Sequence, residues 1–131
     1  MFMYDLIIVG GGPGGVAAGI YAARKKIKTA LITDTIGGQS LVSADVQNWI
    51  GTKSVSGFDL GKMLEEHLRA QEDMEVMDGD LVSAVEDAGD RFKISTKSGK
   101  NLEAKYLLLA SGSKRHRLGV PGEDKLDGKG V

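Results

Sequence analysis

The sequence contains no cysteine and only two prolines, and aromatic side chains make up 5% of its 131 residues. The absence of cysteine excludes disulfides, thiolate metal sites and a thiol nucleophile within these residues. Neither sign of charge dominates, because 17 Lys and Arg stand against 18 Asp and Glu, for a net charge of -1. This balance does not favour a nucleic acid or an acidic membrane surface as a partner.

Long apolar runs are also absent. The apolar segment at the start is too short for a membrane span, and it lacks the basic region and long apolar stretch of a signal peptide. We therefore expect a soluble, cytoplasmic protein with no membrane partner. Hydrophobic residues nevertheless make up 41% of the chain, which is enough to bury the core of one α/β unit.

Glycine is abundant, with 19 residues, and its clustering is informative. The apolar run at residues 4–9 predicts a strand buried on both faces of a parallel sheet. A helix is predicted over residues 13–25, where apolar residues recur at helical spacing. Between strand and helix stand Gly10, Gly12 and Gly15, which form a G-x-G-x-x-G pattern.

Each residue of this turn has a physical task in a dinucleotide site. Gly10 makes the tight turn, Gly12 leaves room for a diphosphate against the backbone, and Gly15 lets the helix pack closely. Pro13 and Gly14 begin the helix, where proline loses no amide hydrogen bond. Phosphates would rest on the amide groups there, because the helix dipole corresponds to roughly half a positive charge.

An acidic residue about twenty positions further on completes such a site. Asp34 follows a second predicted strand, residues 29–33, and is suited to accept hydrogen bonds from ribose hydroxyls. The alternative is that Asp34 only starts a turn. We favour the ribose contact, which also argues against a 2′-phosphorylated nucleotide. The pattern does not separate FAD from NAD.

The rest of the chain is divided by its turn residues. We expect a long irregular loop, a second helix, a third short strand, three runs forming an antiparallel meander, and a strand that re-enters the parallel sheet. A charged, glycine-rich connector follows. In order, these segments are residues 34–57, 58–71, 74–77, the three runs 81–86, 92–97 and 101–104, then 106–110 and 113–131.

No residue is a convincing catalytic or metal-binding candidate. His67 and His116 have no carboxylate neighbours at metal-ligand spacing, so we expect no metal site. Trp49 could stack on a flavin, but packing of the long loop is the commoner use of a lone tryptophan.

Several motifs together resemble the N-terminal part of the thioredoxin reductase family, which includes the flavoprotein subunit of alkyl hydroperoxide reductase. The resemblance covers essentially all 131 residues. The motifs are YDLIIVGGGPGG at residues 4–15, GGQ at 37–39, VQNWIG at 46–51, LLLASGS at 107–113, and VPGED and GKGV near the end.

The resemblance implies an α/β fold: a Rossmann-like FAD-binding domain whose parallel sheet carries a three-stranded antiparallel meander and lacks its last strand. It implies an incomplete FAD-binding lobe at residues 1–112 and a connector at 113–131. Residues matching family positions near FAD are Gly37, Gly38 and Gln39 beside the flavin, Asn48 at the isoalloxazine edge, Val82 near the adenine, and Ala110, Ser111 and Gly112 passing close to the cofactor. Ser111 stands where the family has threonine, and Ile50 where proline is frequent.

The resemblance also implies a longer parent protein. In the family, NAD(P)H reduces FAD, and the flavin reduces a disulfide on a thioredoxin-like or peroxidase partner. The Cys-x-x-Cys pair and the NAD(P)H site lie beyond these residues, so we expect a truncated chain that is inactive alone. Without the missing strand, the strand at residues 106–110 would expose an apolar edge with unpaired amides, which predicts a homodimer or weakened FAD retention.

Two other interpretations remain open. One is the FAD domain of a ferredoxin-NADP reductase of the thioredoxin reductase type, which lacks the cysteine pair. The other is a non-catalytic nucleotide-binding module that holds NAD or ADP.

Overall fold

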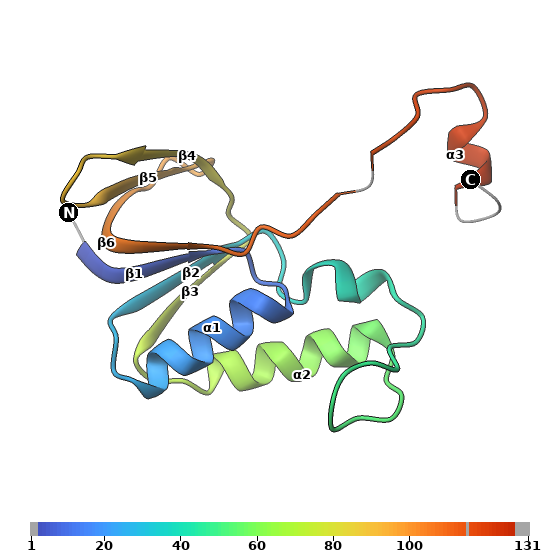
Figure 1. The fold of residues 1–131 in the computed structure, drawn as a ribbon, viewed down its shortest axis with the longest axis horizontal. Helices are drawn as coiled ribbons and strands as arrows, with labels where there is room; N and C mark the ends of the chain where they lie inside the picture. The colour runs from blue at the N-terminus through green and yellow to red at the C-terminus, as the bar shows by residue number, and fades with distance from the viewer. Residues whose placement is uncertain (1–2, 115, 128–131) are drawn as a thin grey trace.

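The computed structural model describes residues 3–114 and 116–127, and it contains one mixed sheet with two long helices on one face (Figure 1). The strands are β1 (Met3–Val9), β2 (Thr29–Thr33), β3 (Met74–Asp78), β4 (Val82–Asp87), β5 (Phe92–Thr96) and β6 (Asn101–Leu109). The helices are α1 (Pro13–Arg24), α2 (Gly57–Arg69), the short α3 (Glu123–Leu126) and the 3₁₀ helix η1 (Gly38–Val42). The sheet order is β3-β2-β1-β6-β5-β4.

The parallel part of the sheet consists of β3, β2, β1 and the second half of β6. All five residues of β2 are buried, and the three between its terminal threonines are apolar, as expected for a strand covered on both faces. Ala30 and Ile32 belong to the hydrophobic cluster on one face of the sheet, and Leu31 belongs to the cluster on the other. The alternation follows from the period of two along a strand.

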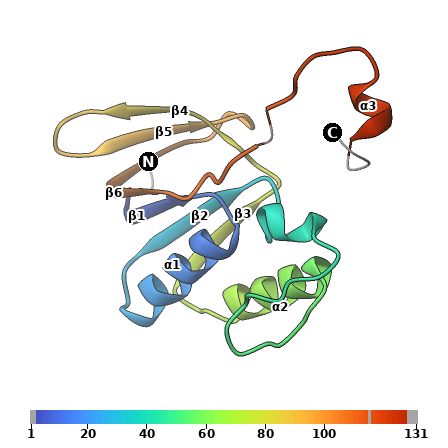
Figure 2. The same cartoon turned by 45° about the vertical axis from the view of Figure 1, so that its right-hand side comes forward.

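Strand β6 serves both the parallel sheet and the meander. Residues 101–104 pair antiparallel with β5, and residues 103–109 pair parallel with β1. The prediction of two separate strands here was therefore wrong, although the antiparallel meander β4-β5-β6 is confirmed. Because β6 bends between its two partners, β4 and β5 fold back over the parallel strands (Figures 1 and 2).

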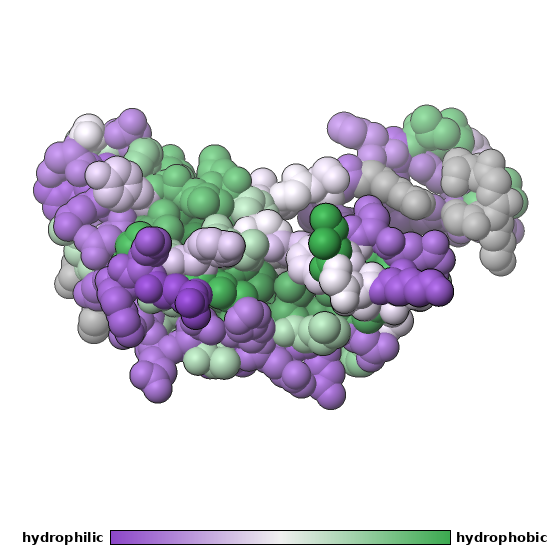
Figure 3. Space-filling view, turned by 60° about the horizontal axis from the view of Figure 1, so that its bottom comes forward, coloured by the Kyte–Doolittle hydropathy of each residue, from purple (hydrophilic) through white to green (hydrophobic). Residues whose placement is uncertain are grey.

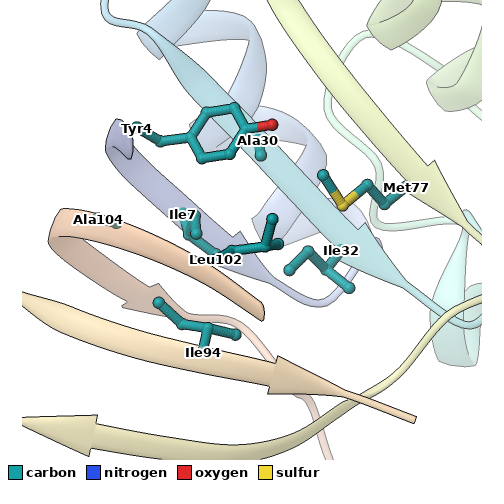
Figure 4. Close-up of a cluster of buried hydrophobic side chains, with 8 residues drawn as sticks. All are labelled: Tyr4, Ile7, Ala30, Ile32, Met77, Ile94, Leu102 and Ala104. Atoms are coloured by element: carbon teal, nitrogen blue, oxygen red, sulfur yellow. The ribbon is translucent and has the colours of Figure 1, made fainter. Parts of the chain in front are cut away.

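Two hydrophobic cores result from this arrangement. One fills the space between the parallel strands and the folded-back meander, as Figure 4 shows. It contains Tyr4, Ile7, Ala30, Ile32, Met77, Ile94, Leu102 and Ala104. The other core lies between the sheet and the helices, and it contains Ile8, Val16, Ile20, Leu31, Ile36, Leu60, Leu64 and Leu68.

The two long helices begin in different ways. Helix α1 starts at Pro13, and its N-cap residue Gly12 provides no side-chain cap. Helix α2 starts after Ser56, whose hydroxyl accepts a 3.0 Å hydrogen bond from the backbone N–H of Asp59. Such a cap satisfies a donor that the helix itself leaves unpaired.

Helix α2 confirms most of its predicted pattern. Leu60, Leu64 and Leu68 are buried, and Arg69 pairs with Glu65 at 2.7 Å, as their spacing of four residues in the sequence predicts. The sequence spacing of Phe58 and Met63 with these leucines predicts that they share the buried stripe, but they are 69% and 49% exposed. They lie beside the stripe because 3.6 residues per turn carry these positions out of contact with the sheet.

The long segment before α2 is more ordered than the sequence predicted. It contains η1 and an isolated β-bridge between Val46 and Val55. Trp49 packs against the core beneath the helices, which confirms the packing interpretation.

The expected connector is described only at residues 113–114 and 116–127, which include α3. Residues 115 and 128–131 of that expectation lie outside the described residues. No helix among residues 3–114 and 116–127 is long and apolar enough to cross a bilayer.

Candidate nucleotide-binding site

The candidate site lies where the strand order reverses. From β1 the chain passes through α1 to β2 on one side, and it returns as β6 on the other side of β1. Val9 and Leu109 are register partners, so the segments after β1 and β6 leave the sheet together. In open parallel sheets, ligands bind outside the carboxyl ends of the strands at such a reversal.

The glycine turn after β1 is packed against the segment after β6. Gly10 has a φ of 110°, and a Cβ placed on it would lie 2.2 Å from the carbonyl oxygen of Ala110. A Cβ on Gly15 would lie 1.9 Å from the carbonyl oxygen of Gly10. Both glycines are therefore required by contacts within the chain, which matches the tasks predicted for the turn and for close helix packing.

Among the described residues, the first amide groups of α1 have no side-chain acceptor. No side chain caps it, and no acidic residue lies in its first turn, in contrast to α2 with Ser56 and Asp59. Gly14, at the second helical position, is exposed. A helix start without its own acceptor is suited to bind an anion, because backbone N–H groups and the helix dipole act together.

A second pair of glycines lies against the turn. The N–H of Gly37 donates to the carbonyl oxygen of Gly11 at 2.8 Å. Gly38 has a φ of 54°, and a Cβ on it would lie 3.0 Å from the Cα of Gly12. The structure thus brings Gly37 and Gly38, at the start of η1, against the glycine turn after β1.

Gly12 provides a test of whether a diphosphate fits. Its φ of −70° and ψ of −179° suit any residue, and a Cβ on it would have its nearest neighbour at 4.0 Å. Contacts within the described chain therefore do not require glycine here, unlike at Gly10 and Gly15. Close approach of a phosphate to the backbone does require it, so the residues present fit such a ligand.

Asp34 follows β2 at the same edge of the sheet. Its side chain is exposed. Within residues 3–114 and 116–127 its carboxylate has neither a hydrogen bond nor an ion pair with the protein. The carboxylate is therefore available to a ligand, although Asp34 also lies in the bend that follows β2, where the alternative of a residue that only starts a turn placed it.

The other sequence-derived residues lie in neighbouring segments. Gln39 is exposed in η1, Asn48 is exposed in the loop beyond it, and Ser111 and Gly112 are exposed after β6. Val82 begins β4 and packs at the margin of the core beneath the meander. In the described part of the chain, no hydrogen bond joins Gln39, Asn48 or Val82 to the glycine turn.

Sequence reasoning missed two residues of this site. The buried Thr33 accepts a 2.9 Å hydrogen bond from the N–H of Gly11. Gly11 stands between two motif glycines, and Thr33 directly precedes Asp34. These positions beside predicted site residues were the only indication in the sequence that Gly11 and Thr33 belong to the site. No group of three potential metal ligands occurs among the described residues.

The fold and these turns define a class of protein, the Rossmann-like dinucleotide-binding domains. Residues 4–131 match the protein family described as "Pyridine nucleotide-disulphide oxidoreductase". The chain belongs to this family.

Individual proteins are also similar to this chain. The chain is 40% identical over 131 residues to the F subunit of alkyl hydroperoxide reductase from Pseudomonas aeruginosa, with 98% of this chain covered. It is 37% identical over 128 residues to the protein of that name from Staphylococcus epidermidis, again with 98% of this chain covered. Among solved structures, it is similar to the thioredoxin reductase of Lactococcus lactis, with a TM-score of 0.86 and 32% identity over 94% of this chain.

The chain spans 25% of the length of these two relatives and 40% of the Lactococcus lactis chain. The match to the solved structure supports the α/β fold with its mixed sheet.

Proposed function

We propose that this chain binds FAD and is the FAD-binding part of a thioredoxin reductase-like flavoprotein. In that protein, electrons pass from NAD(P)H through FAD to a protein disulfide. The observation that carries the proposal is that three backbone segments meet at the strand reversal: the glycine turn after β1, Gly37 and Gly38, and the segment after β6. They lie beside the start of α1, which no side chain caps. The similarity to thioredoxin reductases and to the F subunit of alkyl hydroperoxide reductase supports the flavin as cofactor.

The diphosphate would be held by the backbone between Gly10 and Gly15. Gly12 gives the phosphates access to the main chain, and the amide of Gly14 lies at the positive end of α1. Asp34 would accept hydrogen bonds from the adenosine ribose. The remaining proposed contacts are Pro13 at the helix start, Gly37, Gly38, Gln39 and Asn48 towards the flavin, Val82 towards the adenine, and Ala110, Ser111 and Gly112 alongside.

When bound, FAD supplies the hydride and electron transfer chemistry. This chain would contribute binding and orientation, since no group of three potential metal ligands and no cysteine lies among its described residues. The proposed disulfide partner is a thioredoxin-like protein or a peroxidase. NAD(P)H would bind to another part of the parent protein. A cytoplasmic location stays a prediction.

Titration of the purified chain with FAD tests the proposal. We expect quenching of flavin fluorescence with saturation and a flavin absorbance spectrum that stays with the protein on rapid desalting. NAD⁺ and ADP serve as competitors. A chain that binds NAD⁺ and leaves FAD in solution would overturn the flavin proposal in favour of a nucleotide-binding module.

The outer edge of β6 supports the proposed homodimer. Strand β5 covers β6 only at residues 101–104, so residues 105–109 have no strand partner on that side within the described chain. Tyr106 and Leu109 are 69% and 68% exposed. Separately from this edge, hydrophobic side chains reach the surface on the face drawn in Figure 3, with hydrophilic side chains beside them. An apolar strand edge of this kind favours pairing with another strand.

A further inference from the structure

A series of buried and partly buried hydrogen bonds connects the backbone segments that form the proposed nucleotide site. It begins at Thr33, the last residue of β2, which is 6% exposed. The Thr33 hydroxyl accepts a hydrogen bond from the N–H of Gly11 at 2.9 Å, and it donates to the carbonyl oxygen of Thr35 at 3.0 Å. One hydroxyl therefore ties the glycine turn to the segment that contains Asp34.

Gly11 is held from two sides. A Cβ on Gly11 would lie 2.7 Å from the Oγ1 of Thr33, so the threonine side chain packs directly against the backbone of the turn. The carbonyl oxygen of Gly11 accepts the hydrogen bond from Gly37 at 2.8 Å. Because both backbone groups of Gly11 are used inside the protein, its orientation is set by Thr33 and Gly37. The position of Gly12 follows, since it is the next residue along the chain.

The contacts continue from Thr33 to Asp80. The N–H of Asp80 donates to the carbonyl oxygen of Thr33 at 3.1 Å. Asp80 is 6% exposed, and its Oδ1 accepts from the N–H of Leu81 at 2.8 Å and from the N–H of Ser98 at 3.1 Å. Its Oδ2 accepts from the Ser98 hydroxyl. Asp80 thus joins the end of β2, the β3-β4 turn and the β5-β6 turn.

The Asp80 carboxylate is held by hydrogen-bond donors, with no ion pair in the described part of the chain. These hydrogen bonds, with that of the Ser98 hydroxyl the largest cause, lower the pKa of Asp80 to about 2. The carboxylate is therefore ionised near neutral pH, and both of its oxygens accept hydrogen bonds in that form.

Thr33 precedes Asp34, and Asp80 lies two residues before Val82, so the contacts support both sides of the adenosine site proposed above. We propose that Thr33 and Asp80 are positioning residues of the nucleotide site, which set the affinity for FAD without contacting it. Thr33 fixes the backbone of the glycine turn through its hydrogen bond with Gly11. Asp80 fixes the start of β4 relative to the end of β2. This inference rests on the proposed function.

Strand β2 offers a matched control at its other end. Thr29 is also a buried threonine, and its hydroxyl donates to the carbonyl oxygen of Ile27 at 2.8 Å. Thr29 is the first residue of β2, whereas the glycine turn lies at the other end of the strand, next to Thr33. Thr29→Val and Thr33→Val therefore each remove one hydroxyl from the same strand, and only the second removal affects the turn.

The test is the Kd for FAD, measured by flavin fluorescence at a temperature where circular dichroism shows each variant folded. The Thr33→Val variant loses both hydrogen bonds of the hydroxyl, and we expect it to raise the Kd about tenfold, on the scale of the one buried hydrogen bond that holds Gly11. Thr33→Ser should restore binding, and Thr29→Val should keep the Kd of the unmodified chain. A merely structural role would lower the melting temperature of both valine variants and leave both Kd values alone.

Asp80→Asn supplies an independent measurement should Thr33→Val not fold. It removes the anionic acceptor of the Ser98 hydroxyl, and we expect the Kd for FAD to rise here as well. If Asp80→Asn and each folded Thr33 variant bind FAD like the unmodified chain, or if Thr29→Val weakens binding equally, the positioning role is wrong. If the unmodified chain itself does not bind FAD, the proposed function fails, and the positioning role fails with it.

Discussion

The carbonyl oxygen of Gly10 lies 1.9 Å from the position that a Cβ on Gly15 would occupy. The first turn of α1 is thus in direct contact with the backbone that leaves β1. This contact fixes the start of the helix relative to the sheet, and it leaves no room for a side chain between them.

Gly15→Ala should therefore destabilise the chain by about 3 kcal/mol, because a methyl group meets backbone that cannot move independently. Urea denaturation followed by circular dichroism measures the loss. Gly19→Ala, on the same helix, is the control. Its Cβ would meet the end of the Met74 side chain at 2.7 Å. That flexible end can move, so we expect a much smaller change in the free energy of unfolding. Equal losses in the two variants would contradict this account.

Gly12→Ala should separate binding from stability. Its Cβ has no protein atom closer than 4.0 Å, so the free energy of unfolding should fall by no more than about 1 kcal/mol, the scale of an N-cap change. The Kd for FAD should rise at least about tenfold, because the methyl group occupies space needed by a phosphate. Ala17→Ser, exposed on the same helix, should change neither quantity. Unchanged FAD affinity in Gly12→Ala would argue against a diphosphate at this turn.

Asp34→Ala should weaken nucleotide binding with little effect on folding. The side chain is exposed and has no hydrogen-bond or ion-pair partner in the described chain, so the change in stability should stay within about 0.5 kcal/mol. Losing hydrogen bonds from a charged group to the ribose should raise the Kd for FAD and ADP about tenfold or more.

Isothermal titration with ADP isolates this contact, because ADP lacks the flavin. Glu72→Ala, an exposed carboxylate ahead of β3 at the opposite edge of the sheet, is the control. Equal ADP affinity in the Asp34 and Glu72 variants would show that Asp34 does not bind the sugar.

The Asp80 carboxylate predicts a pH dependence of stability. Its pKa is lowered from 3.8 to about 2 in the folded chain, so the folded state favours the ionised form. The stabilisation is fully present above the unfolded pKa, and it is lost as the pH falls from about 4 to about 2.

Thermal unfolding of the unmodified chain and Asp80→Asn between pH 2 and pH 6 measures this effect. The unmodified chain should have the higher Tm at pH 6, and the difference should shrink as the pH falls through this window. A difference in Tm that is constant over the range would mean that Asp80 does not titrate as a buried acceptor.

Leu109→Lys tests whether the edge of β6 mediates self-association. A charged side chain on an exposed strand edge opposes pairing with a second strand. We expect sedimentation velocity to show a shift towards monomer relative to the unmodified chain. Leu126→Lys, at a similarly exposed leucine outside the sheet, should leave the association unchanged. A monomer in the unmodified chain at high concentration would contradict the proposed dimer.

The sequence by itself determined the local elements around the site. The run before Gly10, the proline at position 13 and the apolar spacing after it predicted β1, the turn and α1, and the structure confirms them. Turn and helix signals of this kind act between near neighbours, so they can be recognised without knowing the fold. The pairing of Glu65 with Arg69 was also predictable, because four residues span about one helical turn.

Only the tertiary structure decided which distant segments meet. Residues 101–104 alternate and residues 106–110 are apolar, so they predicted two strands, yet bending lets one strand pair with both β5 and β1. The contacts of Thr33 with Gly11 and of Asp80 with Ser98 join residues 22 and 18 positions apart. Their side chains carry no periodic signal, because a buried polar group is defined by the partners that the fold brings to it.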